Sequence, residues 1–150
     1  MKERTLCRRQ MMQDLMQIYR EVVADCPQGT TQTQVYSMVV SHPAPRFYID
    51  ARMAHLRISP MMRGDRSVLE KLSPLKRQMY EDLYEKVMAL SQKKGFWHKS
   101  LYHILKEAVL EPAPRFYIDT TRMGQIWREK NIETRQQRYK RIGKPYERKD

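Results

Sequence analysis

The side chains that could read nucleic-acid bases fall in two short polar stretches, each at the start of a predicted helix. They are Thr31, Gln32, Thr33 and Gln34 in the first half of the chain, and Lys99, Ser100 and His103 in the second. Glutamine can pair bidentately with adenine, and serine or threonine can contact bases or phosphates. Because the two stretches differ, they would read unlike half-sites of duplex DNA. The alternative is that these residues only cap and solvate their helices.

Other basic side chains could hold the phosphate backbone. Arg46 and Arg115 occupy matching places in two copies of one motif, and a tyrosine on which a guanidinium can stack lies two residues after each. Further cations lie near the C-terminus: Arg135, Arg138, Lys140, Arg141 and Lys144. Such a cluster neutralises phosphates by counterion release, which gives salt-sensitive and weakly sequence-selective binding. A purely structural motif and a solvated tail are the alternatives.

No residue pattern indicates catalysis. The chain has four scattered histidines: His42, His55, His98 and His103. The two cysteines, Cys7 and Cys26, have no Cys or His near them at metal-ligand spacing, so reduced thiols are expected. Phosphate-loop and nucleophile-elbow signatures are missing. We therefore expect no enzyme activity, no cofactor, no metal and no small-molecule substrate.

The composition favours a polyanionic partner. The 150 residues include 29 Lys and Arg against 17 Asp and Glu, which gives a formal net charge of +12 and a pI near 9.9. A charge of this size bears on partners and not on fold, and it places nucleic acid first among them. No apolar run is long enough to cross a bilayer, and the first residues lack the apolar core of a secretion signal. A cytoplasmic protein with no membrane partner is expected.

One octapeptide, Pro-Ala-Pro-Arg-Phe-Tyr-Ile-Asp, occurs twice, at 43–50 and at 112–119. Self-similarity of this kind indicates a duplicated unit. The first predicted helix of each unit also keeps five residues: Arg9, Gln10, Met11, Asp14 and Leu15 match Arg77, Gln78, Met79, Asp82 and Leu83. The expected division is repeat one at 1–72, repeat two at 73–127 and a basic C-terminal extension at 128–150, with the repeats packed as one globular unit.

Each repeat is predicted to read helix, turn, helix, short strand, helix. Apolar residues at three-and-four spacing mark the helices, and Ser, Thr, Asp, Pro and Gly mark their ends. The expected helices are 5–24, 31–41 and 51–59 in the first repeat; in the second they begin at Ser73, span 100–110, and run from Asp119 through Trp127 and on to about Tyr139. Pro60 is expected to end the third helix, with Met53 and Leu56 facing inward.

The strands are expected at 46–49 and 115–118, where aromatic and β-branched residues follow the prolines. Because so short a strand is not stable alone, the two should pair. The predicted fold class is therefore mainly α: a pseudo-twofold tandem duplication of a helix-turn-helix-strand-helix unit with a small central two-stranded antiparallel ribbon.

The octapeptide and the helix before it resemble a motif of short, uncharacterised helical proteins from gut-bacterial mobile elements and their phages. That family has no assigned activity. The resemblance implies a mobile-element or phage setting inside a bacterial cell, or association with a virion.

Together these features predict a non-catalytic nucleic-acid-binding protein that prefers duplex DNA, through two diverged helix-turn-helix-like units and a basic C-terminal arm. The alternative is a structural or adaptor protein, such as a virion or assembly component, which uses the paired motif to contact a protein partner. The eleven methionines favour that alternative slightly, because Met-rich surfaces adapt to several partners.

Overall fold

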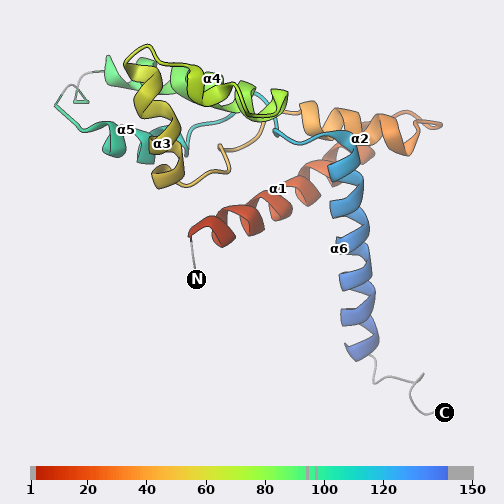
Figure 1. Ribbon diagram of the computed structural model, residues 1–150. Helices are drawn as coiled ribbons and strands as arrows, with labels where there is room; N and C mark the ends of the chain where they lie inside the picture. Colours follow the sequence, from red (N-terminus) through yellow and green to blue (C-terminus); the bar gives the residue numbers. More distant parts are fainter. Residues whose placement is uncertain (1–2, 94, 97, 142–150) are drawn as a thin grey trace.

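The protein is mainly helical (Figure 1). A computed structural model describes residues 3–93, 95–96 and 98–141. The elements are α1 (Glu3–Asp25), α2 (Gln32–Ser41), α3 (Ala51–Met62), the 3-10 turn η1 (Ser67–Leu69), α4 (Pro74–Ser91), α5 (Leu101–Ala108) and α6 (Thr120–Arg141). Helices α3, α4 and α5 lie together on one side of the molecule. Helix α2 lies on the other side, next to the C-terminal end of α1 and the N-terminal end of α6. The C-terminal part of α6 projects away from the body.

Five helices begin where the sequence predicts, because a capping side chain stands before each of them. The caps are Thr31, Asp50, Ser73, Ser100 and Asp119, and each side-chain oxygen accepts a backbone N–H from the first turn. Those N–H groups have no partner within the helix. Local sequence therefore sets the starting points of the helices.

The predicted end of the third helix was wrong. α3 continues through Pro60, and Gly64, at φ 84°, turns the chain after it. Proline removes only one backbone hydrogen bond, which matters little in a last turn. The predicted inward face was also wrong, since Met53 is 41% exposed and Leu56 is 62% exposed. Small side chains let α3 pack closely through another face: Ala51, Ala54, Ile58 and Met61 are buried instead.

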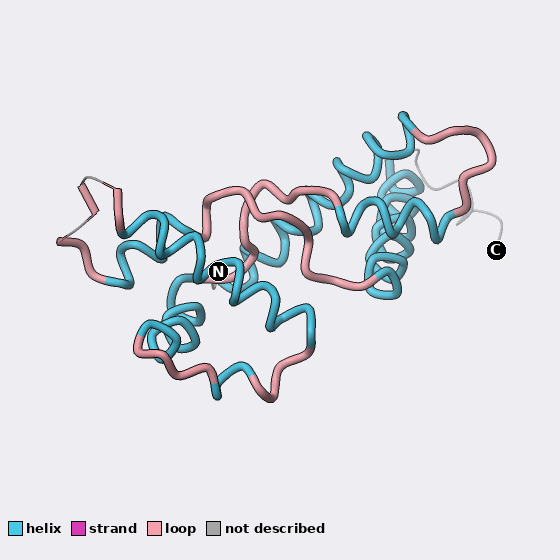
Figure 2. Tube along the Cα trace, turned by 90° about the horizontal axis from the view of Figure 1, so that it is seen from above, coloured by secondary structure: helices cyan, strands magenta, loops and turns pink. Residues whose placement is uncertain are grey.

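The third helix of each repeat packs on the helical pair of the other repeat. α3 contacts α4 and α5, and α6 contacts α2. The ring of Tyr19 in α1 also stacks on Trp127 in α6, with centroids 3.9 Å apart. The two loops that carry the octapeptides run side by side at the centre of the molecule (Figure 2). Neither repeat therefore closes its own core.

The predicted two-stranded ribbon was wrong, because the described residues contain no strand. The two octapeptides meet at one isolated antiparallel bridge between Ala44 and Ala113. These alanines exchange both backbone N–H···O bonds at 2.9 Å, and each is 2% exposed. The unit is thus two helices, an extended loop and a third helix.

The pairing stops at one bridge because the next backbone donors bond elsewhere. The Phe47 N–H donates to the Val109 carbonyl at 2.9 Å, and the Phe116 N–H donates to the Val40 carbonyl at 3.1 Å. The Val109 carbonyl belongs to the C-cap residue of α5, and the Val40 carbonyl lies in the last turn of α2. The last C=O groups of a helix have no partner within the helix. Each octapeptide therefore completes the end of a helix in the other repeat, and no strand ladder forms.

Candidate functional site

The polar stretch that opens α2 is largely occupied within the protein. The Thr31 side chain accepts from the Gln34 N–H at 3.2 Å, and the Gln34 side chain accepts from the Thr31 N–H at 2.9 Å. Gln32 donates to two tyrosine hydroxyls, one in α1 and one in α2, at 2.8 and 3.0 Å. Thr33 is exposed. Three of the four predicted base-reading side chains are thus held by intramolecular bonds, as the capping alternative expects.

The opening of α5 leaves more charge at the surface. Ser100 caps the helix by accepting the His103 N–H at 3.2 Å. The Lys99 ammonium lies 3.1 Å from Nε2 of His103 and 5.6 Å from the centre of the Phe96 ring. Lys99, Ser100 and His103 are all exposed. The two openings therefore differ in availability as well as in sequence.

The two shared arginines make contacts inside the protein. Nε of Arg46 and Nε of Arg115 each donate to the carbonyl of the phenylalanine that follows, at 3.0 and 3.1 Å. Nη2 of Arg46 also lies 3.5 Å from Sγ of Cys7, and Nη2 of Arg115 donates to the Ile118 carbonyl at 3.4 Å. Both side chains are half-buried. These bonds give both arginines an intramolecular role, whereas the predicted phosphate contacts stay a prediction.

A pair of tyrosine–aspartate hydrogen bonds was missed by sequence reasoning. The Tyr48 hydroxyl donates to Asp14, and the Tyr117 hydroxyl donates to Asp82, both at 2.5 Å. Burial first, and then the bond to the carboxylate, raise the pKa of both tyrosines above the ordinary value. Each octapeptide is thereby fixed to the first helix of its own repeat.

The matching residues of the first helices contained the signal for these bonds. Gln10 donates to Asp14 at 3.0 Å, and Gln78 donates to Asp82 at 2.8 Å. A glutamine and an aspartate four residues apart lie on one helical face, so the amide holds the carboxylate in place for the tyrosine. The retained polar pair therefore indicated a shared intramolecular partner.

The octapeptides also contact each other through stacked rings. Phe47 stacks on Tyr117 with centroids 6.1 Å apart, and Tyr48 stacks on Phe116 at 5.7 Å. The two phenylalanines are almost fully buried. Offset stacking at these distances is favourable beyond the burial of area. Five of the eight motif residues, the alanine, arginine, phenylalanine, tyrosine and aspartate, contribute to these stacked rings or to the bridge, hydrogen bonds, caps and core described above.

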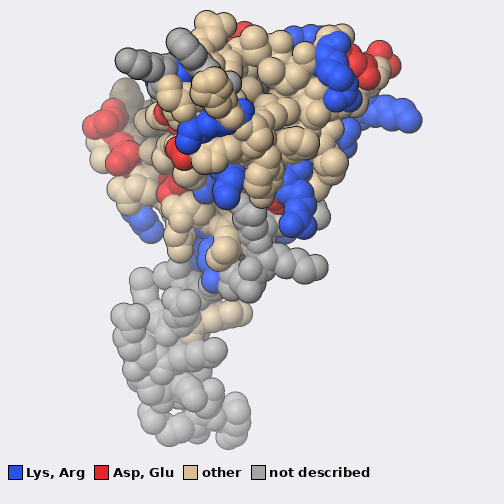
Figure 3. Space-filling view, turned by 90° about the vertical axis from the view of Figure 1, so that its left-hand side faces the viewer, with Lys and Arg blue, Asp and Glu red and all other residues tan. Residues whose placement is uncertain are grey.

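Few of the basic side chains in the described part of the chain form a salt bridge. Within the described part of the chain the salt bridges are Arg66–Glu81 and Arg122–Glu129, the second at 4.0 Å. Six carboxylates of the described residues instead accept internal hydrogen bonds from uncharged groups: Asp14, Glu21, Asp50, Asp65, Asp82 and Asp119. Figure 3 shows lysine and arginine side chains spread over one face, with acidic groups at its edges and a few among the basic ones.

The predicted C-terminal arm begins inside α6. Positions 135, 138, 140 and 141 belong to this helix, and Lys144 lies outside the described residues. Nine Lys or Arg and four Asp or Glu occur in 128–150. The helix was expected to continue to about Tyr139, and α6 extends to Arg141. The structure thus attaches positions 135, 138, 140 and 141 to the body through one continuous helix.

The comparisons with known proteins add no family. Among the described residues no helix is long and apolar enough to cross a membrane, and no group of His, Cys, Asp or Glu is placed to hold a metal ion. No protein-family model, no curated protein and no solved structure matches the chain.

Proposed function

We propose that the protein binds nucleic acid without catalysis, through the basic part of α6 and the cations of the adjoining surface. Duplex DNA is the expected form, in a mobile-element or phage setting. The supporting observation is one of charge: the sequence has 29 basic residues against 17 acidic ones, and two salt bridges are formed within the described part of the chain. A positive field that is not neutralised internally attracts a polyanion.

Base reading at the start of α2 has less support than phosphate contact. Thr31, Gln32 and Gln34 already have intramolecular partners, so contact with a base would require breaking those bonds. α2 also contains no lysine or arginine. Contact through α6 and through Lys99 and His103 would instead be electrostatic, with a weak sequence preference.

The test is a gel-shift series with DNA and RNA over a range of salt concentrations. We compare the full chain with a fourfold variant of α6: Arg135→Gln, Arg138→Gln, Lys140→Gln and Arg141→Gln. Each lost phosphate contact should reduce the slope of log K against log salt by about 0.9, so the expected reduction is roughly 3 to 4 in total.

The matched control removes the same charge elsewhere: Arg52→Gln, Arg63→Gln, Lys71→Gln and Lys93→Gln, all exposed. This variant should keep most of the salt slope. Equal losses in both variants would reject α6 as the main contact. An absence of binding to either nucleic acid at low salt would reject the function itself.

An adaptor function is the second candidate, and exposed apolar side chains favour it. Leu56 on α3 is 62% exposed and Leu110 after α5 is 59% exposed. Such residues occur at protein interfaces, although single ones are common on any surface. Copurification of one defined protein partner in the absence of nucleic acid would support this candidate over the first.

A further inference from the structure

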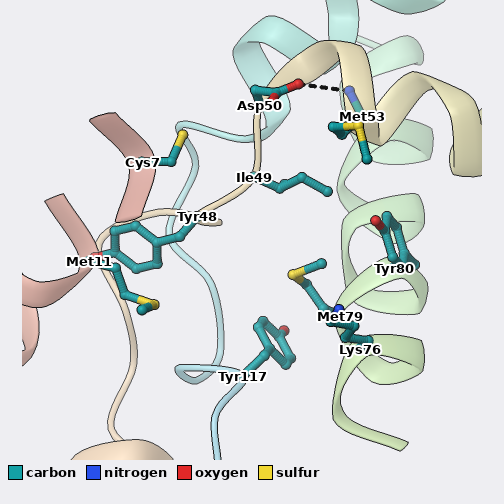
Figure 4. A pocket seen from close by; sticks show the side chains of 10 residues that line it. All are labelled: Cys7, Met11, Tyr48, Ile49, Asp50, Met53, Lys76, Met79, Tyr80 and Tyr117. Carbon is teal, nitrogen blue, oxygen red and sulfur yellow. Dashed lines mark hydrogen bonds between the residues drawn. The ribbon is translucent and has the colours of Figure 1, made fainter. Parts of the chain in front are cut away.

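A pocket of about 310 Å³ lies at the junction of the two repeats (Figure 4). Cys7 and Met11 enter it from α1, and Met79 and Tyr80 enter it from α4. The octapeptides add the rings of two tyrosines, Tyr48 and Tyr117. This volume lies at the lower end of the range of small-ligand sites. The pocket is thus large enough for a compact molecule and is walled by both halves of the chain.

The pocket wall offers mostly rings and thioethers, because the hydroxyl groups of its two octapeptide tyrosines are engaged. The hydroxyls of Tyr48 and Tyr117 donate to Asp14 and Asp82, so their rings are what remains for a ligand. Methionine side chains adapt to irregular shapes and make favourable sulfur contacts with aromatic rings. A flat aromatic body fits this lining better than a sugar or another polyhydroxylated molecule.

The mouth of the pocket carries one free charge, and it is positive. Lys76 lines the pocket, is exposed and forms no salt bridge with any residue that the structure describes. Asp50 also lines it, but this carboxylate accepts the Met53 N–H at 2.7 Å at the start of α3. The positive end of the helix dipole offsets that negative charge. A negatively charged group is therefore favoured near Lys76.

We propose that this pocket binds an aromatic monoanion, an arylcarboxylate with its ring between the methionines and tyrosines and its carboxylate at Lys76. The proposal does not depend on nucleic-acid binding. The probe is 2-naphthoate, and a ligand of this size is expected to bind with a Kd of about 0.1 to 1 mM.

The test follows the methyl groups of ¹³C-labelled methionines in the full chain by NMR while 2-naphthoate is added. The signals of Met11, Met53 and Met79 should shift together and saturate, because a bound ring lies beside them. Met38, on α2, is 43% exposed against 41% for Met53 and does not line the pocket. Its signal is the internal control and should stay in place.

Two further ligands and two variants test whether the positive charge of Lys76 contributes to binding the carboxylate. Lys76→Gln should weaken 2-naphthoate about fivefold, as expected for a partly exposed ion pair, and leave the neutral 2-naphthamide unchanged. Lys71→Gln, at an exposed lysine outside the pocket, should change neither. The proposal is overturned if Met38 shifts as much as Met53, if no signal saturates, or if 2-naphthylmethylammonium binds more tightly than 2-naphthoate.

Discussion

Single residues of the octapeptide have separate and complementary tasks. The alanine forms the bridge, the phenylalanine fills the core, the tyrosine binds a carboxylate and the aspartate caps the next helix. The arginine holds the loop through a backbone carbonyl. Each of these residues makes its own contact in each copy. Substituting any one of them would therefore remove a contact that no other residue of the motif supplies. Packing and hydrogen bonding therefore account for these five residues in both copies of the motif.

Removing the tyrosine hydroxyls should lower the free energy of unfolding. For Tyr48→Phe or Tyr117→Phe we expect a loss of about 1 to 2 kcal/mol each, because a half-buried carboxylate loses one of its two side-chain donors. Urea unfolding measures this loss. Tyr102→Phe is the control, since its exposed side chain contacts its neighbours through the ring. A similar loss for Tyr102→Phe would show that the two carboxylate bonds contribute nothing specific.

The same tyrosines should make stability depend on alkaline pH. Their folded pKa values are raised above the unfolded value of 10.0, so the unfolded chain ionises first. Stability is then complete below about pH 10 and falls as the pH rises above it. The slope should be at most about 1.4 kcal/mol per pH unit for each tyrosine, and less where solvent screens the pair.

The measurement for this effect is the urea midpoint between pH 8.5 and 11 for the native chain and for the double variant Tyr48→Phe/Tyr117→Phe. The variant should lose stability less steeply with rising pH. Parallel curves would contradict a raised pKa at these two positions.

At the scale of single residues, the sequence predicts side-chain contacts between residues that are close along the chain. Thr31 and Asp50 could be assigned as caps because their partners lie three residues away. The partner of Tyr48 lies 34 residues away along the chain. Local pattern does not specify such a contact, although the duplicated Gln and Asp pointed to it.

At the scale of elements, the spacing of apolar residues located the helices. The prediction of two strands was wrong, for a physical reason. An extended aromatic segment has the composition of a strand, but it becomes one only if its backbone groups find a second strand. Here the N–H groups of Phe47 and Phe116 bond to helix ends instead. The choice between these partners depends on where α2 and α5 end in space, which the segment itself does not encode.

The packing of α6 on α2 should be sensitive to one glycine. A Cβ built at Gly124 would lie 3.1 Å from a ring carbon of Tyr36. Gly124→Leu should therefore force the helices apart and cost about 1 to 3 kcal/mol. Gln125→Leu, at an exposed neighbouring position, is the control and should be nearly neutral. Thermal unfolding followed by circular dichroism compares the two, and equal midpoints would argue against this close approach.

At the scale of the whole molecule, the third helix of each repeat packs on the other repeat, which joins the two repeats in one core. One cluster of buried residues extends through both repeats. Leu15 and Leu83 occupy matching places in α1 and α4, and both are 0% exposed. The sequence shows the octapeptide twice, but it did not predict that the third helix of each half packs on the other half, because an apolar face does not specify which helix covers it.

Damage to either repeat should accordingly unfold both. Leu15→Ala and Leu83→Ala should each cost about 2 to 5 kcal/mol, because each leaves a cavity in the shared core. Hydrogen exchange should then show loss of protection in both repeats, and urea unfolding should show one transition. A second transition, or exchange confined to the altered repeat, would show that the repeats fold separately.

The link between α3 and α4, residues 63–73, places both helical pairs in one polypeptide. Separate identical subunits would have to display every substitution twice. When the two halves belong to one polypeptide, a substitution can change one half alone, and the two halves are always present in equal number. The opening of α2 is neutral and internally bonded, whereas the opening of α5 displays a lysine and a histidine. A shared framework can thus keep its joint unchanged while its two outer faces specialise for different tasks.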